Sequence, residues 1–211
     1  MGTNIKVRYL SYEGIGGIAS NQLIKYDMSE GIPIEIEKLL DNQFKINIIP
    51  FPNLYNDFKI NAFTSSDLKK IYVDENLYEN LEPQYRFTLA HEYGHMVLHG
   101  NFYRQFKIKD IESYVDFLNS IDRIEYGHLE YQANCFAGHF LIPSDHLERQ
   151  FKIRSKSVIS YIRTKFINKR RANYLDFATT LIADKMMSDF KVHSRPIQIR
   201  IEKDSLQKLI P

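Results

Sequence analysis

The sequence predicts an α+β fold, with a few short strands grouped before the middle of the chain and helices elsewhere. Residues 46–51, 59–64 and 69–74 are short runs of β-branched and aromatic side chains separated by Asn, Ser, Asp and Pro, which is typical of strands. The last two runs are expected to pair through the turn at residues 65–67. The flanking segments instead repeat apolar residues at helical spacing. Strands in one block with helices in others are characteristic of the α+β class.

The predicted helices follow from the period of their apolar residues. They cover residues 32–44, 83–99, 110–122, 127–141 and 174–187. Gly100 is expected to stop the second helix, and Pro143 to end the fourth. The alternating run Ile197–Ile201 predicts a half-buried strand. Residues 13–17 are rich in Gly but lack the Lys and Ser or Thr of a phosphate-binding loop, so we interpret them as a turn.

Length, charge and cysteine content narrow the class of protein. The 211 residues suit a main domain over 1–145 and a helical extension over 146–211 that carries a basic segment and ends in a strand. A net charge of +2 is too small to draw the whole chain to nucleic acid or to a membrane. The sequence has no signal-peptide core and no run near the roughly 18 apolar residues of a membrane span. Because Cys135 has no partner for an internal disulfide, we expect a cytoplasmic protein.

The strongest chemical signal is the motif His91-Glu92-Tyr93-Gly94-His95, which satisfies H-E-x-x-H on a predicted helix. Residues four apart project from one helix face, so the two imidazoles can hold one ion. Glu92 emerges to one side, where it can act as a general base on water without being a ligand. The surrounding helix is apolar, and a metal would offset the cost of burying these polar groups. Gly94 indicates that something packs closely against the helix backbone.

A zinc hydrolase of this kind needs a third protein ligand and an open fourth position. Glu130 is the leading acid, because it lies on the next downstream helix and shares a face with Asn134, which could orient a ligand histidine. Glu125 is the weaker alternative, since it is expected in the preceding loop. The predicted metal site is therefore Zn²⁺ held by His91, His95 and Glu130.

Other polar residues near these motifs are assigned structural roles. His99 is about 80° further round the helix than His91 and is interpreted as a helix-end histidine satisfied by carbonyls or water. His128 and His139 lie near the third-ligand helix, and a structural role is favoured for each. Cys135 is interpreted as a small buried hydrophobe.

Two separated segments, RFTLAHEYGHMVLHG (86–100) and EYQANCFAGHFLIP (130–143), resemble the ImmA/IrrE family of bacterial metallopeptidases. The family pattern runs R-F-T-L-A-H-E-x-G-H-x-x-L-H and then E-x-E-A-N-x-F-A-x-x-L-L-x-P. The upstream runs IPIEIEKLL and KKIYVDENL also resemble its first helix and the strand before the metal helix. One departure is that the second acid of E-x-E-A-N is Gln132 here, which leaves Glu130 as the acid available for a metal.

The resemblance implies a zincin-like α+β fold and, as in characterised members, cleavage or inactivation of a helix-turn-helix repressor. We therefore expect a zinc-dependent endopeptidase whose partner is a protein substrate and not a membrane, with direct binding of nucleic acid left as the less favoured alternative. The alternative is a non-proteolytic regulator that keeps the fold and binds a repressor or antitoxin to displace it. Intact His91, Glu92, His95 and Glu130 favour the enzyme.

The sequence predicts the metal ligands and the general base more sharply than it predicts the substrate-binding strand or the group that stabilises the oxyanion. A substrate strand is expected to pair with residues 70–74 as an edge strand. The group that stabilises the oxyanion is open among Tyr93, Tyr126, His128 and His139. Residues 152–171 carry eight cations and no acid, so this segment is either a solvated surface or a docking site for an acidic partner or nucleic acid.

Overall fold

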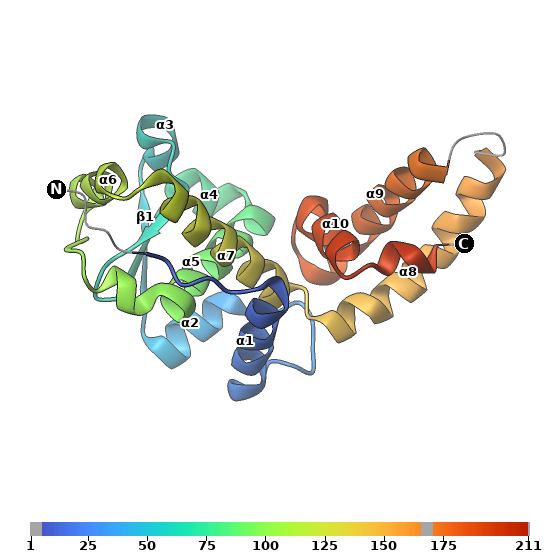
Figure 1. Cartoon of the computed structure of the whole chain (residues 1–211), viewed down its shortest axis with the longest axis horizontal. Helices are drawn as coiled ribbons and strands as arrows, with labels where there is room; N and C mark the ends of the chain where they lie inside the picture. The colour runs from blue at the N-terminus through green and yellow to red at the C-terminus, as the bar shows by residue number, and fades with distance from the viewer. Residues whose placement is uncertain (1–5, 166–170, 211) are drawn as a thin grey trace.

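The computed structural model describes residues 6–165 and 171–210, and within these ranges the side chains of 163–165 and 171–173 are not described. In chain order the elements are α1 (Tyr12–Lys25), α2 (Ile36–Phe44), β1 (Asn47–Phe51), α3 (Leu54–Phe58), β2 (Ala62–Thr64), β3 (Lys70–Asp74), α4 (Glu75–Asn80), α5 (Glu82–Tyr103), α6 (Ile111–Ser120), α7 (Arg123–Leu141), α8 (Ser144–Lys165), α9 (Arg171–Phe190), α10 (Ser194–Lys203) and a short 3-10 helix, η1 (Leu206–Leu209). This is the α+β class that the sequence predicted, with a small mixed sheet among many helices (Figure 1).

The sheet has three strands in the order β1-β3-β2. β2 and β3 pair antiparallel, as predicted for the two runs on either side of the turn at 65–67, and β1 pairs parallel to β3. The prediction that residues 70–74 form an edge strand is wrong, because β1 occupies the other side of β3. Within the described sheet, β2 is the edge strand that packs against α5, the helix that carries H-E-x-x-H.

The close crossing of α5 and α7 brings the two motif segments together. Gly94 allows it: a Cβ built on Gly94 would lie 3.1 Å from Phe136 Cδ1 and 3.3 Å from the Cα of Ala133, both on α7. Tyr93 and Phe136 pack edge to face beside this contact, with ring centroids 5.6 Å apart. The absence of a side chain at Gly94 therefore sets the distance between the helices that carry H-E-x-x-H and Glu130.

Replacing this glycine tests the packing directly. Gly94→Ala is expected to destabilise the protein, since overpacking costs about 1–3 kcal/mol and outweighs the roughly 1 kcal/mol gain in helix propensity. Gly127→Ala on α7 is the matched control: nothing lies within 4 Å of its added Cβ, so stability should rise by about 0.5–1 kcal/mol. Urea unfolding of the metal-free proteins measures both changes. A higher free energy of unfolding in both variants would mean that α5 and α7 do not pack tightly at Gly94.

Several helix boundaries differ from the predictions. α2 begins at Ile36 and not at residue 32, and α9 spans Arg171–Phe190 and not 174–187. α5 continues past Gly100 to Tyr103, because Gly100 is not in a left-handed cap conformation but lies against Leu68, which its Cβ would approach to 3.1 Å. α7 begins at Arg123, four residues before the predicted start, because the Asp122 side chain accepts hydrogen bonds from the first backbone N–H groups. Glu125 is therefore on the helix and not in a loop.

Two further predictions are wrong for reasons of packing. Residues 13–17 are part of α1 and not a turn, since Gly16 lets α1 lie against the ring of His139. Residues 197–201 form part of α10 and not a strand: Ile197, Arg200 and Ile201 are buried, which is helical spacing with an arginine on the inner face. That arginine donates to the carbonyls of Gly138 and Ile142 and so joins α10 to the end of α7.

Helices α8, α9 and α10 lie together on the side of the molecule away from the sheet (Figure 1). One apolar cluster nevertheless extends from α1 to the segment after α10, and the domain boundary near residue 145 stays a prediction.

Residues 166–170 of the basic segment lie outside the described residues. In its first part Lys152 pairs with Glu148 on the same helix, and Arg154 pairs with Asp189 of α9; the role of the segment stays a prediction. None of the helices in the described ranges is both long and apolar enough to cross a membrane.

Candidate metal centre

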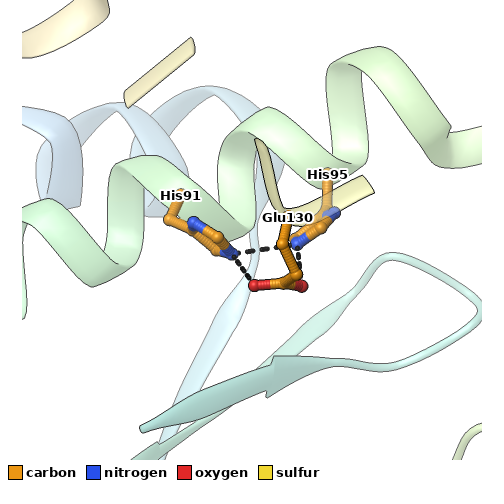
Figure 2. Close-up of side chains that lie close together, drawn as sticks. All are labelled: His91, His95 and Glu130. Atoms are coloured by element: carbon orange, nitrogen blue, oxygen red, sulfur yellow. Dashed lines mark hydrogen bonds and ion pairs between the residues drawn. The ribbon is translucent and has the colours of Figure 1, made fainter. Parts of the chain in front are cut away.

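His91 and His95 project from one face of α5, and Glu130 reaches toward both from α7 (Figure 2). The two Nε2 atoms are 3.0 Å apart, and the carboxylate oxygens of Glu130 lie 3.4 Å from Nε2 of His91 and 3.3 Å from Nε2 of His95. The potential ligand atoms of all three residues lie within 4.8 Å of one another. The three side chains that the sequence singled out are thus close enough to hold one metal ion.

A chain of contacts behind His95 determines which of its nitrogens carries the proton. Gln132 donates from Nε2 to the carbonyl of Arg8 (2.8 Å), so its Oε1 must accept from Nε2 of His99 (3.0 Å). Neutral His99 then accepts at Nδ1 from Nδ1 of His95, 3.1 Å away. This is the one proton arrangement that gives each contact a donor and an acceptor when both rings are neutral. It leaves the lone pair of His95 Nε2 directed at the three-residue cluster.

His91 is oriented in the same way. Its Nδ1 lies 3.1 Å from Oδ1 of Asn134, an acceptor, so the ring donates there and its lone pair is also on Nε2. Two nitrogen lone pairs and a carboxylate therefore converge on one small space. Because these groups repel one another unless positive charge lies between them, the donor set fits a divalent metal ion.

The pKa shifts agree with a site built for a cation. Burial, aided by the charge of His91, lowers the pKa of His95 to about 4, so this ring is neutral and free to bind a metal. Burial opposes the charge of Glu130, but the hydrogen bonds and positive charge that the two histidines supply when they are protonated outweigh burial and hold its pKa far below the usual range. For His91, burial is outweighed by the hydrogen bond and charge of Glu130, so its pKa is raised: without a cation between them, the carboxylate favours the charged form of this ring, and a bound metal ion would supply that positive charge instead.

Glu92 lies beside this cluster and does not belong to it. Its side chain is buried, and Thr64 at the end of β2 donates a hydrogen bond of 2.7 Å to Oε2. Burial raises the pKa of Glu92 to about 7, although the charge of His91 and the bond from Thr64 lower it in part. Such a group exchanges a proton near neutral pH, which suits a general acid or base.

The cluster opens onto a cleft of about 400 Å³. Residues 59–62, which lead into the edge strand β2, form one wall, and the other walls carry side chains of α5, α6 and α7. Of the four oxyanion candidates, Tyr126 lines this cleft, whereas the hydroxyl of Tyr93 donates to Gln22 (2.8 Å). His139 is buried against Tyr12, with ring centroids 4.4 Å apart, and His128 is exposed.

Sequence reasoning missed several contacts that shape the site. Thr64 carries no local signal, because it meets Glu92 only when β2 packs beside α5. His99 is buried between His95 and Gln132, so its expected partners, carbonyls or water, were wrong. Gln132 could have indicated this contact from sequence, because the ImmA/IrrE pattern has an acid at its position. Glu125 points away from the cluster and accepts a hydrogen bond from the backbone N–H of Val7.

Comparison with known proteins agrees with this geometry. Residues 42–166 match the model of the IrrE N-terminal-like domain of the peptidase M78 family, which is more than half of the chain. No curated protein matches the sequence. Among solved structures, the chain is similar to a Mycobacterium tuberculosis transcriptional regulator, with a TM-score of 0.54 and 18% identity over 90% of this chain and 46% of that one.

At that identity the likeness is one of fold, and the chain spans less than half of that regulator. The family match covers the strands, the H-E-x-x-H helix and the helix of Glu130, which are the elements that build the cluster. The resemblance to the ImmA/IrrE family is confirmed, and the chain belongs to the peptidase M78 family through its IrrE N-terminal-like domain.

Proposed function

We propose that this chain is a zinc-dependent endopeptidase that cleaves a helix-turn-helix transcriptional repressor or an antitoxin-like partner. The observation that carries the proposal is Glu92, a carboxyl group that is buried next to the metal-binding cluster and is hydrogen-bonded by Thr64. Burying a carboxyl group costs free energy, and a scaffold that only binds a partner gains nothing from it. A protein that hydrolyses peptide bonds needs a proton acceptor at this place.

Each residue of the cluster has a role in this proposal. His91, His95 and Glu130 would hold the metal, while Asn134 and His99 accept from the Nδ1 atoms of the two rings and so direct Nε2 of each ring at it. When bound, the metal supplies a Lewis acid that acidifies water and polarises the scissile carbonyl. Glu92 accepts the proton of the attacking water at Oε1, since Thr64 occupies Oε2, and passes it to the leaving amine.

The cleft also provides groups for the substrate. An extended polypeptide can add to the free edge of β2, whose first residue, Ala62, lines the cleft together with residues 59–61, so its carbonyl is presented to the cluster. Tyr126 is the proposed donor to the oxyanion. Burial, followed by the charge of Glu130, raises the pKa of its hydroxyl, which therefore stays protonated and able to donate.

A regulatory substrate is supported by the family and by the solved structure that the chain resembles, a transcriptional regulator. The test uses purified protein and small helix-turn-helix proteins encoded in the same genome, with any product of a neighbouring gene tried first. Mass spectrometry is expected to find one discrete cleavage, which a chelator stops and added zinc restores. Release of that protein from its DNA without cleavage would instead establish the non-proteolytic alternative.

A further inference from the structure

An apolar groove of about 370 Å³ lies beside the cleft, between α7 and α10. Its apolar walls are formed by Tyr12, Phe87, Tyr131, Cys135, Pro196 and Ile199. Tyr131 and Ile199 are 48% and 39% exposed, although both are large and apolar. Apolar side chains left exposed together in one hollow are characteristic of a binding surface.

The groove is continuous with the metal-binding cleft. Phe87 and Asn134 line both hollows, and Asn134 contacts His91 itself. Phe87 lies one helical turn before His91 on α5, so only that turn separates the groove from the cluster. A polypeptide held with one peptide bond at His91 and His95 therefore places a neighbouring side chain at the mouth of the groove.

The charges around the groove are basic. Arg195 and Lys203 line it from α10, and no acidic residue is among the described residues that line it. Arg195 faces Glu202 at 4.0 Å, an exposed pair that competes only weakly with a substrate carboxylate. Arg200 also lines the groove, but its guanidinium is occupied by backbone carbonyls, Ser144 and Asp204. The surface therefore complements an apolar side chain with an acidic neighbour.

We propose that this groove binds a large apolar side chain of the substrate, next to the scissile bond, and that Arg195 and Lys203 favour an acidic residue beside it. The proposal rests on the proposed endopeptidase function for its substrate. It also assigns a role to α10, which lies beyond residue 166, where the family match ends. The C-terminal helices then select the sequence that the M78 domain cleaves.

The first experiment profiles cleavage of a proteome-derived peptide library by the zinc-loaded protein. The cleaved peptides are expected to share Leu, Phe or Met at one fixed position beside the cut, with Asp or Glu enriched next to it. Ile199→Asp should lower kcat/KM for these peptides roughly tenfold or more, because the apolar pocket is lost. Ile153→Asp is the matched control, since Ile153 is 55% exposed on α8 and does not line the groove.

A second experiment reads occupancy of the groove without hydrolysis. Cys135, the single cysteine of the chain, lies in the groove, so its rate of alkylation by iodoacetamide reports access. The probes are a hexapeptide with one Phe flanked by Glu residues and the same peptide with Ala in place of Phe, added to zinc-loaded Glu92→Gln protein. The Phe peptide should slow alkylation and the Ala peptide should not. Ile199→Asp should remove the protection, and Ile153→Asp should keep it.

The outcomes separate the two proposals. Library cleavage without an apolar preference, or wild-type selectivity in Ile199→Asp, would overturn the groove and leave the endopeptidase standing. Protection of Cys135 by the Phe peptide without any library cleavage would support the groove and contradict the endopeptidase. Equal alkylation rates with both peptides would contradict substrate binding in the groove. Protection of Cys135 that rises with protein concentration, without any peptide, would also contradict it, because a second copy of the chain would then occupy the groove.

Discussion

Glu92→Gln is expected to lower peptide hydrolysis by a factor of about 10²–10⁴ while the protein keeps its fold and its metal. Glutamine has the same shape and can still accept the hydrogen bond of Thr64, which in the wild-type protein is 2.7 Å long. It cannot take a proton from water. The cluster of His91, His95 and Glu130 is unchanged, so metal binding should not fall. Turnover of the cleaved partner and metal content by elemental mass spectrometry measure the two effects separately.

Glu112→Gln is the control for this substitution, because Glu112 is an exposed residue of α6 with no place in the cluster. It should cleave at the wild-type rate. Loss of metal together with loss of activity in Glu92→Gln would mean that Glu92 is a ligand and not a base. Undiminished turnover by Glu92→Gln would remove this residue from the mechanism.

Glu130→Ala should lower metal affinity by more than the roughly 10–100-fold that loss of an outer hydrogen-bond partner costs. The carboxylate carries the only negative charge among the three converging side chains, and its two oxygens face Nε2 of His91 and Nε2 of His95. Two neutral imidazoles would remain, and hydrolysis should stop. Competition with a chromophoric chelator measures the change in metal affinity.

Glu125→Ala provides the matched comparison on the same helix. The carboxylate of Glu125 accepts from the backbone N–H of Val7 at 2.6 Å and so faces the N-terminal segment. Its loss should leave metal affinity and turnover unchanged. If Glu125→Ala lost metal and Glu130→Ala kept it, the ligand set proposed above would be wrong.

The parts of the site that depend on a single helix could be predicted from the local sequence. The four-residue spacing of His91 and His95 determines a shared face on any regular helix, whatever the helix packs against. Gly94 similarly signalled a close approach before its neighbours on α7 were known. The pairing of β2 with β3 was also predictable, because a short turn joins two runs of strand-forming residues.

Contacts between distant segments needed the tertiary structure. β3 is the central strand only because β1 pairs on its other side, and Thr64 reaches Glu92 only across the boundary between sheet and helix. Residues 197–201 alternate like a strand, yet they are helical because Arg200 turns inward to the carbonyls at the end of α7.

One physical reason separates the features that the sequence predicted from those that needed the tertiary structure. Helical periodicity and turn chemistry act between residues a few positions apart, so the H-E-x-x-H helix and the β2–β3 hairpin were determined by the sequence itself. The strand order, the burial of Arg200 and the apolar groove depend on which surfaces meet when separated segments pack. Only the folded chain decided that α10 lies against α7, and so only the structure placed an apolar groove beside the candidate metal centre.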